Sequence, residues 1–234
     1  MVDASVVRGG PRRRAAPARF RDGQERQRDA ERTRAEILDV ATREFAERGY
    51  NGARVDEIAT KIRTTKRMIY YYFGSKEQLY IAVLERVYQE IRTAEQALEA
   101  DGLDPVEAIR RIAELTFDHH QSHPDFIRLV SIENINRTEH MAKSPAFPGR
   151  NVSVVSLIEQ ILARGRAQGR FARAVDALDV HMLISSYCVF RVANRYTFKT
   201  IFGRDLTDPA LRERYRTMLG DLVVAYLTEL DDDP

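Results

Sequence analysis

The chain has 234 residues, of which 44% are hydrophobic and 31% are charged, and its formal net charge is +2 at pH 7. This length and apolar content allow one small and one larger domain, each with a buried core. No apolar run reaches the ~18 residues that a membrane span requires, and the single cysteine, Cys188, excludes an internal disulfide framework and fits the reducing cytoplasm.

Residues 1–28 differ in composition from the rest of the chain. Glycines and prolines break regular structure there and arginines make the segment basic, so we expect a flexible arm. From Arg28 to Glu47 apolar residues recur at helical spacing, and Gly49 is expected to end this first helix. Its apolar face consists of Ile37, Leu38, Ala41 and Phe45.

Two short helices separated by a tight turn are predicted between Val55 and Phe73. The first has an apolar face made of Val55, Ile58, Ala59 and Ile62. The hydroxyls of Thr64 and Thr65 are suited to cap the second helix. The expected buried side of that helix consists of Met68, Ile69, Tyr72 and Phe73. Gly74 then ends it and Ser75 caps the next helix.

The remaining face of the second helix is predicted to read DNA. Between Arg54 and Lys76 there are six basic and two acidic residues, a net charge of +4. Cations and phenols on a short helix suit the major groove, where they meet phosphates and base edges. A solvated charged surface is the alternative interpretation. The expected DNA contacts are Arg54, Arg63, Thr64, Thr65, Lys66, Arg67, Tyr70, Tyr71 and Lys76.

The chain resembles the amino-terminal domain of TetR/AcrR-family transcriptional regulators in five segments. They are ILDVATREF from Ile37, Gly49-Tyr50, VDEIA from Val55, IYYYF from Ile69 and SKEQLY from Ser75. The resemblance covers residues 29–80 and implies a three-helix DNA-binding domain over residues 29–74. It also implies a homodimer on double-stranded operator DNA, and a small-molecule effector that moves the helix after Ser75 and releases the DNA.

Three arginines depart from the family's pattern. Arg54 stands where the family usually has Ser or Thr, Arg63 where it has Gly, and Arg67 where it has a small residue. Arg54 gives up a helix cap worth about 1 kcal/mol, and Arg63 occupies a turn whose left-handed backbone costs a non-Gly residue on the order of 1 kcal/mol. We hypothesise that phosphate contacts offset these costs. For the basic arm, simple disorder and entry into the minor groove are both open.

Residues 75–230 are predicted to form a larger helical bundle for ligand binding and dimerisation, followed by an acidic tail over residues 231–234. A long helix runs from Ser75 to about Ala97. The further expected helices are Pro105 to Ser122, Pro124 to Arg137, Val152 to Gln168, Ala177 to Phe202 and Pro209 to Leu230. The irregular segment 138–150 is a candidate gate.

Two stripes in the last helices are expected to form a four-helix dimer interface, unless they only complete an internal core. One stripe consists of His181, Ile184, Cys188 and Arg191. The other consists of Tyr215, Met218, Leu219, Leu222, Val223, Tyr226 and Leu227.

Polar and aromatic side chains within otherwise apolar helices are candidates for the effector pocket, although each also suits a core or an interface. They are Phe117, His120, Phe126, Asn134, Tyr187, Phe190, Arg191 and Asn194. Arg191 and Arg195 suit a carboxylate ligand, and equally surface ion pairs.

A histidine cluster supports a different class of function. His119 and His123 are one helical turn apart, next to Asp118 and His120, so a metal-binding helical enzyme is an alternative. Histidines near a helix end also cap carbonyls and meet the helix dipole. We therefore predict an all-α, cytoplasmic, DNA-binding regulator, a repressor without catalytic residues, metal or cofactor. An effector-independent DNA-binding protein is the other alternative.

Overall fold

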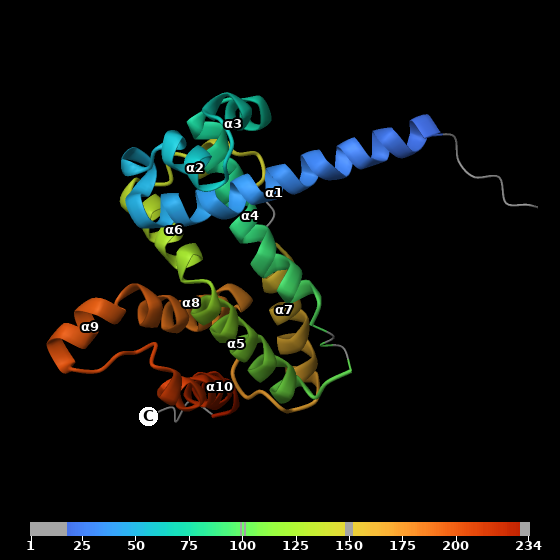
Figure 1. Cartoon of the computed structure of the whole chain (residues 1–234). Helices are drawn as coiled ribbons and strands as arrows, with labels where there is room; N and C mark the ends of the chain where they lie inside the picture. The colour runs from blue at the N-terminus through green and yellow to red at the C-terminus, as the bar shows by residue number, and fades with distance from the viewer. Residues whose placement is uncertain (1–17, 99, 101, 148–151, 230–234) are drawn as a thin grey trace, which may run out of the picture.

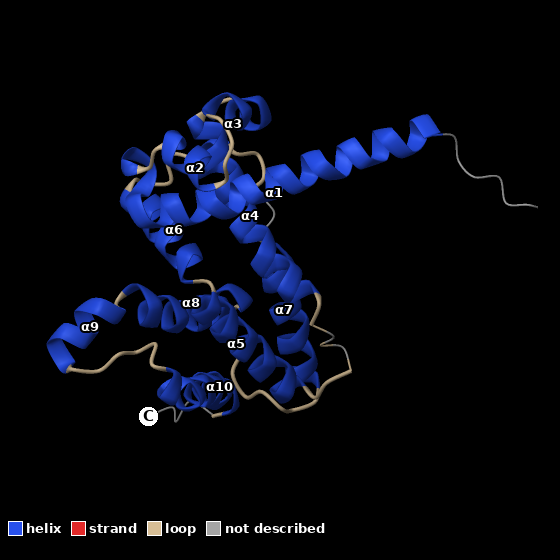
Figure 2. Ribbon diagram, in the orientation of Figure 1, coloured by secondary structure: helices blue, strands red, loops and turns tan. Residues whose placement is uncertain are grey.

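The computed structural model describes residues 18–98, 100, 102–147 and 152–229, and every regular element in that part of the chain is helical. Figure 2 shows the helices and the loops that join them. The elements are α1 (Ala18–Gly52), α2 (Val55–Lys61), α3 (Lys66–Phe73), α4 (Lys76–Gln96), α5 (Pro105–Ser122), α6 (Pro124–Ile135), η1 (Met141–Lys143), α7 (Val152–Ala167), α8 (Ala177–Ala193), α9 (Arg195–Phe202), η2 (Pro209–Leu211) and α10 (Arg212–Thr228).

The helices form two bodies that are linked by α4. In Figure 1, α1, α2 and α3 lie at one end of the molecule with α6 packed beneath α1, and α5, α7, α8 and α10 form a bundle at the other end. Helix α4 runs from the first body to the second. A 21-residue helix spans about 30 Å, so α4 connects the two bodies directly.

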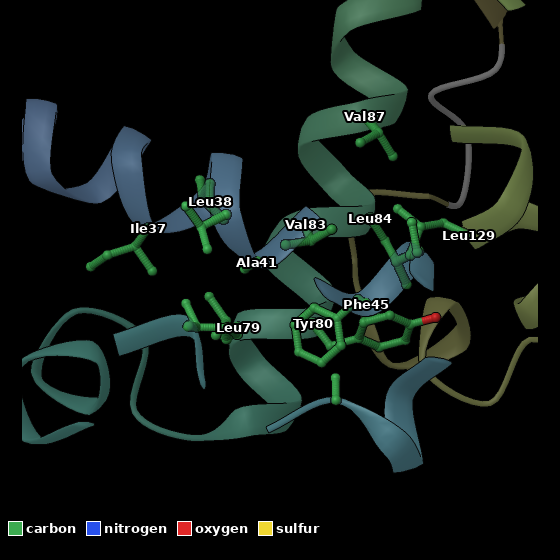
Figure 3. Close-up of a cluster of buried hydrophobic side chains, with 14 of the residues drawn as sticks. Ile37, Leu38, Ala41, Phe45, Leu79, Tyr80, Val83, Leu84, Val87 and Leu129 are labelled. Atoms are coloured by element: carbon green, nitrogen blue, oxygen red, sulfur yellow. The ribbon is translucent and has the colours of Figure 1, made fainter. Parts of the chain in front are cut away.

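Each body has its own hydrophobic core. The first core joins apolar side chains of α1 to α4 with Phe126, Ile127 and Leu129 of α6. Figure 3 shows its centre, where the ring of Phe45 meets that of Tyr80 edge-on at 4.8 Å between centroids. The second core is built from α5, α7, α8 and α10. Because α4 and α6 also contribute to the first core, the domain division between residues 74 and 75 stays a prediction.

Side-chain caps explain several predicted helix starts. Thr65 Oγ1 accepts a hydrogen bond from Met68 N at 3.2 Å, and Ser75 Oγ accepts one from Gln78 N at 3.1 Å. Asp104 and Asp176 cap α5 and α8 in the same way. These caps satisfy amide groups that have no partner within the helix. The starts expected at Pro105, Pro124, Val152 and Ala177 are confirmed.

Helix α1 starts earlier than the sequence pattern suggested. It begins at Ala18, so residues 18–28 are helical, whereas the predicted arm extended to residue 28. After Pro17 the segment is rich in Arg, Gln and Glu, which are good helix formers. Residues 1–17 of the arm and the tail 231–234 lie outside the described residues.

Two other helices in the second body also differ from expectation. The helix predicted from Ala177 to Phe202 is broken at Asn194, where ψ is 6°, so α9 leaves the line of α8. The one predicted from Pro209 begins as a 3₁₀ turn, because Asp208 accepts a hydrogen bond from Ala210 N at 2.9 Å and holds the chain tightly. Regular α-helix then runs from Arg212 to Thr228.

Candidate DNA-binding surface

The turn between α2 and α3 adopts the conformation expected for it. Arg63 has φ 54°, in the left-handed region that favours glycine. Its amide donates to Thr60 O at 3.2 Å, and the amide of Thr64 donates to Ala59 O at 3.0 Å. Arg54, at the N-cap of α2, makes no side-chain cap hydrogen bond. Both predicted costs, the left-handed backbone at Arg63 and the missing helix cap at Arg54, are therefore present.

Helix α3 buries a narrower face than predicted. Ile69 and Phe73 are buried in the first core, as expected. Met68 was expected to be buried and is instead 39% exposed, because α3 has eight residues and its buried stripe runs through Ile69 and Phe73. Met68 is thus a candidate for apolar contact with DNA that the sequence reasoning missed, since the periodicity of so short a helix leaves its flanks ambiguous.

Two of the three phenols on α3, those of Tyr70 and Tyr71, lie in different environments. Tyr71 is 78% exposed. Tyr70 is half-buried and packs against the first core. The exposed surface of α3 therefore presents Lys66, Arg67 and Tyr71, with Tyr70 at its edge.

Several cations of this unit already have partners. Lys66 Nζ lies 3.3 Å from Asp56 Oδ2, and Lys76 Nζ lies 4.9 Å from the centre of the Tyr50 ring. Lys61 Nζ lies 2.7 Å from the buried carboxylate of Glu44. Burial alone would raise the pKa of Glu44, but the hydrogen bond and charge of Lys61 lower it overall. Lys61 thus fastens α2 to α1.

The three arginines that depart from the family pattern have no carboxylate partner among the described residues. The side chains of Arg54, Arg63 and Arg67 are exposed. No carboxylate within the described part of the chain lies within 4.0 Å of their guanidinium groups, while other arginines there, such as Arg86 and Arg216, form ion pairs. Unpaired exposed cations around a short exposed helix suit a polyanion.

The predicted effector residues occupy three places, two of which are in contact, because the Arg191 guanidinium lies 4.0 Å from the centre of the Phe117 ring. Phe117, His120 and Phe126 are buried, and the rings of His120 and Phe126 meet edge-on at 5.4 Å. The other two places are the junction of α8 to α10 and the α6 surface. Asn134 Nδ2 donates to Val130 O of α6 at 2.9 Å and is exposed.

Tyr187, Phe190 and Arg191 line a cavity of about 580 Å³ between α8, α9 and α10. The Arg191 guanidinium is already engaged, since Nη2 donates to Gln121 Oε1 at 3.0 Å and to Leu206 O at 2.8 Å. Asn194 ends α8 and donates to Phe190 O at 3.2 Å.

The histidine cluster joins two buried side chains, His119 and His120, to the exposed His123, and it lacks metal-binding geometry in the described part of the chain. Within the described ranges, no group of three His, Cys, Asp or Glu side chains is placed to hold a metal ion. The rings of His119 and His123 stack at 4.3 Å, and both ring nitrogens of buried His119 have no hydrogen-bond partner. Burial lowers the pKa of His119 to about 3 and that of His120 to about 4.

The predicted stripe on α8 faces inward. Ile184, Cys188 and Arg191 are buried in the second body, and burial raises the pKa of the Cys188 thiol to about 12. The outward face of α8 is a different apolar set, and α10 also has an outward set beside its buried residues. We call this surface the α8–α10 face, and its members are Leu178, Met182, Phe190, Met218, Leu222 and Tyr226, which are 37% to 62% exposed.

None of the helices described here is long and apolar enough to cross a membrane. Comparison with known proteins matches two family models. Residues 37–83 match "Bacterial regulatory proteins, tetR family", and residues 105–223 match "Tetracyclin repressor-like, C-terminal domain".

Relatives of known name cover most of the chain. The chain is 34% identical over 199 residues to the HTH-type transcriptional repressor NicS of Pseudomonas putida. The aligned region covers 85% of this chain and 94% of NicS. It is 31% identical over 161 residues to the HTH-type transcriptional repressor SCO4008 of Streptomyces coelicolor, and the aligned region covers 67% of this chain and 77% of SCO4008. The crystal structure of the regulator SCO4942 of Streptomyces coelicolor superposes with a TM-score of 0.60 at 29% identity, over 81% of this chain and 97% of that one.

Proposed function

The chain belongs to the tetR family of bacterial regulatory proteins and is a helix-turn-helix transcriptional regulator, and we propose that it represses transcription from a palindromic operator until a small molecule releases it. As a regulator of bacterial transcription, it would act in the cytoplasm, and no catalytic step forms part of the proposal. The observation that carries the proposed DNA contacts is the set of unpaired arginines around α3.

In the proposed complex α3 lies in the major groove. Arg67 and Tyr71 on its exposed face meet base edges or phosphates, and Thr64 and Thr65 at its amino end approach the backbone. Arg54 and Arg63 lie at the start of α2 and in the turn, where phosphates of the flanking strand would pass. Lys66, Tyr70 and Lys76 complete the set, and Lys66 would exchange Asp56 for a phosphate.

We propose that the α8–α10 face is the dimer interface. Two short reading helices on one duplex require twofold symmetry, with half-sites about one helical turn apart. The α8–α10 face offers large apolar side chains to a second copy, while the inward stripes complete the core of a single chain. This replaces the α8 residues that the sequence pattern proposed, since Ile184 and Cys188 have no exposure.

The proposed effector binds within the second body. Buried polar groups in the second body support this location of the effector. The main one is His119, whose ring nitrogens lack the hydrogen-bond partners that buried polar groups normally have. Helix α4 contributes to both bodies and would carry the movement to α3. A coupling of about 1 to 3 kcal/mol, or 5- to 150-fold in DNA affinity, is enough for regulation.

Selection of bound duplexes from random DNA by the full-length protein tests the DNA-binding proposal. We expect a palindromic consensus, and at least tenfold weaker binding for Arg67→Gln, because each charge-assisted contact is lost twice per dimer. Arg111→Gln is the matched control, since Arg111 is exposed on α5 beside Glu114. Equal affinity of the two variants would remove α3 from the interface. Repeating the selection with metabolite pools distinguishes an effector-responsive regulator from an effector-independent one.

A further inference from the structure

A cleft of about 730 Å³ lies where the two bodies meet, and neither the DNA-binding proposal nor the effector pocket uses it. Its walls are the end of α1, helix α6 and the junction of α8 and α9. Ala46, Ile127 and Val192 form an apolar floor and are buried. Arg128 and Arg195 stand at its rim.

Two guanidinium groups from different helices converge on one oxygen in this cleft. Arg128 Nη2 of α6 donates to Tyr196 Oη at 3.2 Å, and Arg195 Nη2 of α9 donates to the same oxygen at 2.8 Å. The Arg195 guanidinium also lies 4.6 Å from the centre of the Tyr196 ring. The hydrogen bond from Arg195 lowers the pKa of Tyr196, as a positive potential at that oxygen requires.

Neither arginine has an anionic partner. No carboxylate in the described part of the chain lies within 4.0 Å of Arg128 or Arg195, whereas Arg216 Nε meets Asp118 at 3.2 Å. A phenol is a weaker acceptor than a carboxylate, and a guanidinium presents donors in a fork that matches two carboxylate oxygens. The two groups therefore lack the acceptor that suits them.

The surrounding charges leave the cleft with a cationic excess. Arg43 and Glu47 of α1 and Asp125 of α6 are the other ionisable groups that act on this region. Burial raises the pKa of Asp125 although the charges of Arg128 and Arg195 act to lower it, and Asp125 lies beyond 4.0 Å of both guanidinium groups. The three cations Arg43, Arg128 and Arg195 thus outnumber the two acidic residues, Glu47 and Asp125.

We propose that this cleft binds a small organic carboxylate, with its oxygens held between Arg128 and Arg195 and its apolar body over Ile127 and Val192. The bound molecule would touch α1 of the first body and α6 and α9 beside it. It would therefore set the angle between the reading head and the dimerising helices. This last consequence rests on the proposed function, whereas the binding itself does not.

Calorimetric titration of the full-length protein with benzoate, without DNA, tests the site. We expect one benzoate per chain, and binding at least tenfold weaker in Arg128→Gln and in Arg195→Gln, because each removes one charge-assisted pair. Benzamide has the same shape without the charge and should not compete. Thermal unfolding of each variant shows whether it is folded.

Two control variants sharpen the outcome. Tyr196→Phe keeps the ring and removes the oxygen that occupies both arginines, so it should bind benzoate at least as tightly as the parent chain. Arg111→Gln should leave benzoate binding unchanged. Absence of benzoate binding up to about 10 mM, binding of inorganic phosphate alone, or equal benzoate binding in Arg195→Gln would each overturn the proposal.

A separate measurement tests the consequence of carboxylate binding for DNA affinity. Operator affinity measured by fluorescence anisotropy should change on adding benzoate to the parent chain and not to Arg195→Gln. If benzoate binds as expected and the chain binds no operator, the proposed function fails and the carboxylate site stands. If the chain binds its operator and does not bind benzoate, the carboxylate site fails and the proposed function stands.

Discussion

Replacing Arg63 with glycine separates a backbone cost from a DNA contact. Arg63 has φ 54° and an exposed side chain without an acidic partner among the described residues. A left-handed non-Gly residue costs about 1 to 2 kcal/mol, and glycine costs about 0.5 to 1 kcal/mol in unfolded-chain entropy. Arg63→Gly should therefore stabilise the fold by up to about 1.5 kcal/mol while it weakens DNA binding.

The size of the DNA effect follows from one phosphate contact in each protomer. Each neutralised phosphate contributes about 0.9 to the slope of log affinity against log salt, so a dimer loses about 1.8. Between about 50 and 200 mM salt, the affinity ratio of parent to variant should then shrink about 12-fold. Fluorescence anisotropy with a selected operator at several salt concentrations measures both slopes.

Two matched variants isolate the cause. Arg63→Lys keeps the charge on the same backbone and should retain the parent slope. Arg137→Gly relieves a second exposed arginine at φ 56°, outside the α2–α3 unit, so it should change stability similarly and leave the salt slope unchanged. An unaltered slope in Arg63→Gly would refute the phosphate contact.

Three further predictions follow from buried and exposed groups. Because burial lowers the pKa of His119 and His120 to about 3 and about 4, their neutral rings contribute stability that is fully present above pH 6.5 and lost as the pH falls below it. Urea unfolding between pH 7 and 5 should show this loss, and His119→Gln should flatten the profile. Glu133 is buried and accepts the amides of His140 and Met141 at 3.2 and 3.0 Å, so Glu133→Ala should destabilise the fold by about 3 kcal/mol; a loss below about 1 kcal/mol would mean that water replaces the carboxylate. Leu222→Glu should convert the dimer to monomers in sedimentation, and a persisting dimer would place the interface away from the α8–α10 face.

Local features of the reading head could be predicted from sequence. Thr65 and Ser75 cap the helices that their hydroxyls suggested, Gly74 ends α3 with φ 77°, and Arg63 adopts the left-handed turn. These outcomes depend on a residue and its neighbours within four positions. The same locality applies to the starts of α5 and α8, which Asp104 and Asp176 cap.

Pairings between distant residues were not predictable. Lys61 meets Glu44 across 17 positions, Lys66 meets Asp56 across ten, and both reduce the cations free for DNA. The break at Asn194 was also missed, since α8 and α9 are both helical in pattern and only the change of direction separates them.

Composition and periodicity by themselves determined that this chain is helical, where its reading head lies and which residues turn and cap it, because backbone geometry is decided within a few residues. Tertiary structure alone decided which apolar faces remain uncovered. Ile184 and Leu222 belong to similar stripes, yet one is buried and the other exposed. It also brought Arg128 and Arg195 together from separate helices, because which faces meet depends on how the helices pack, and no local pattern encodes that.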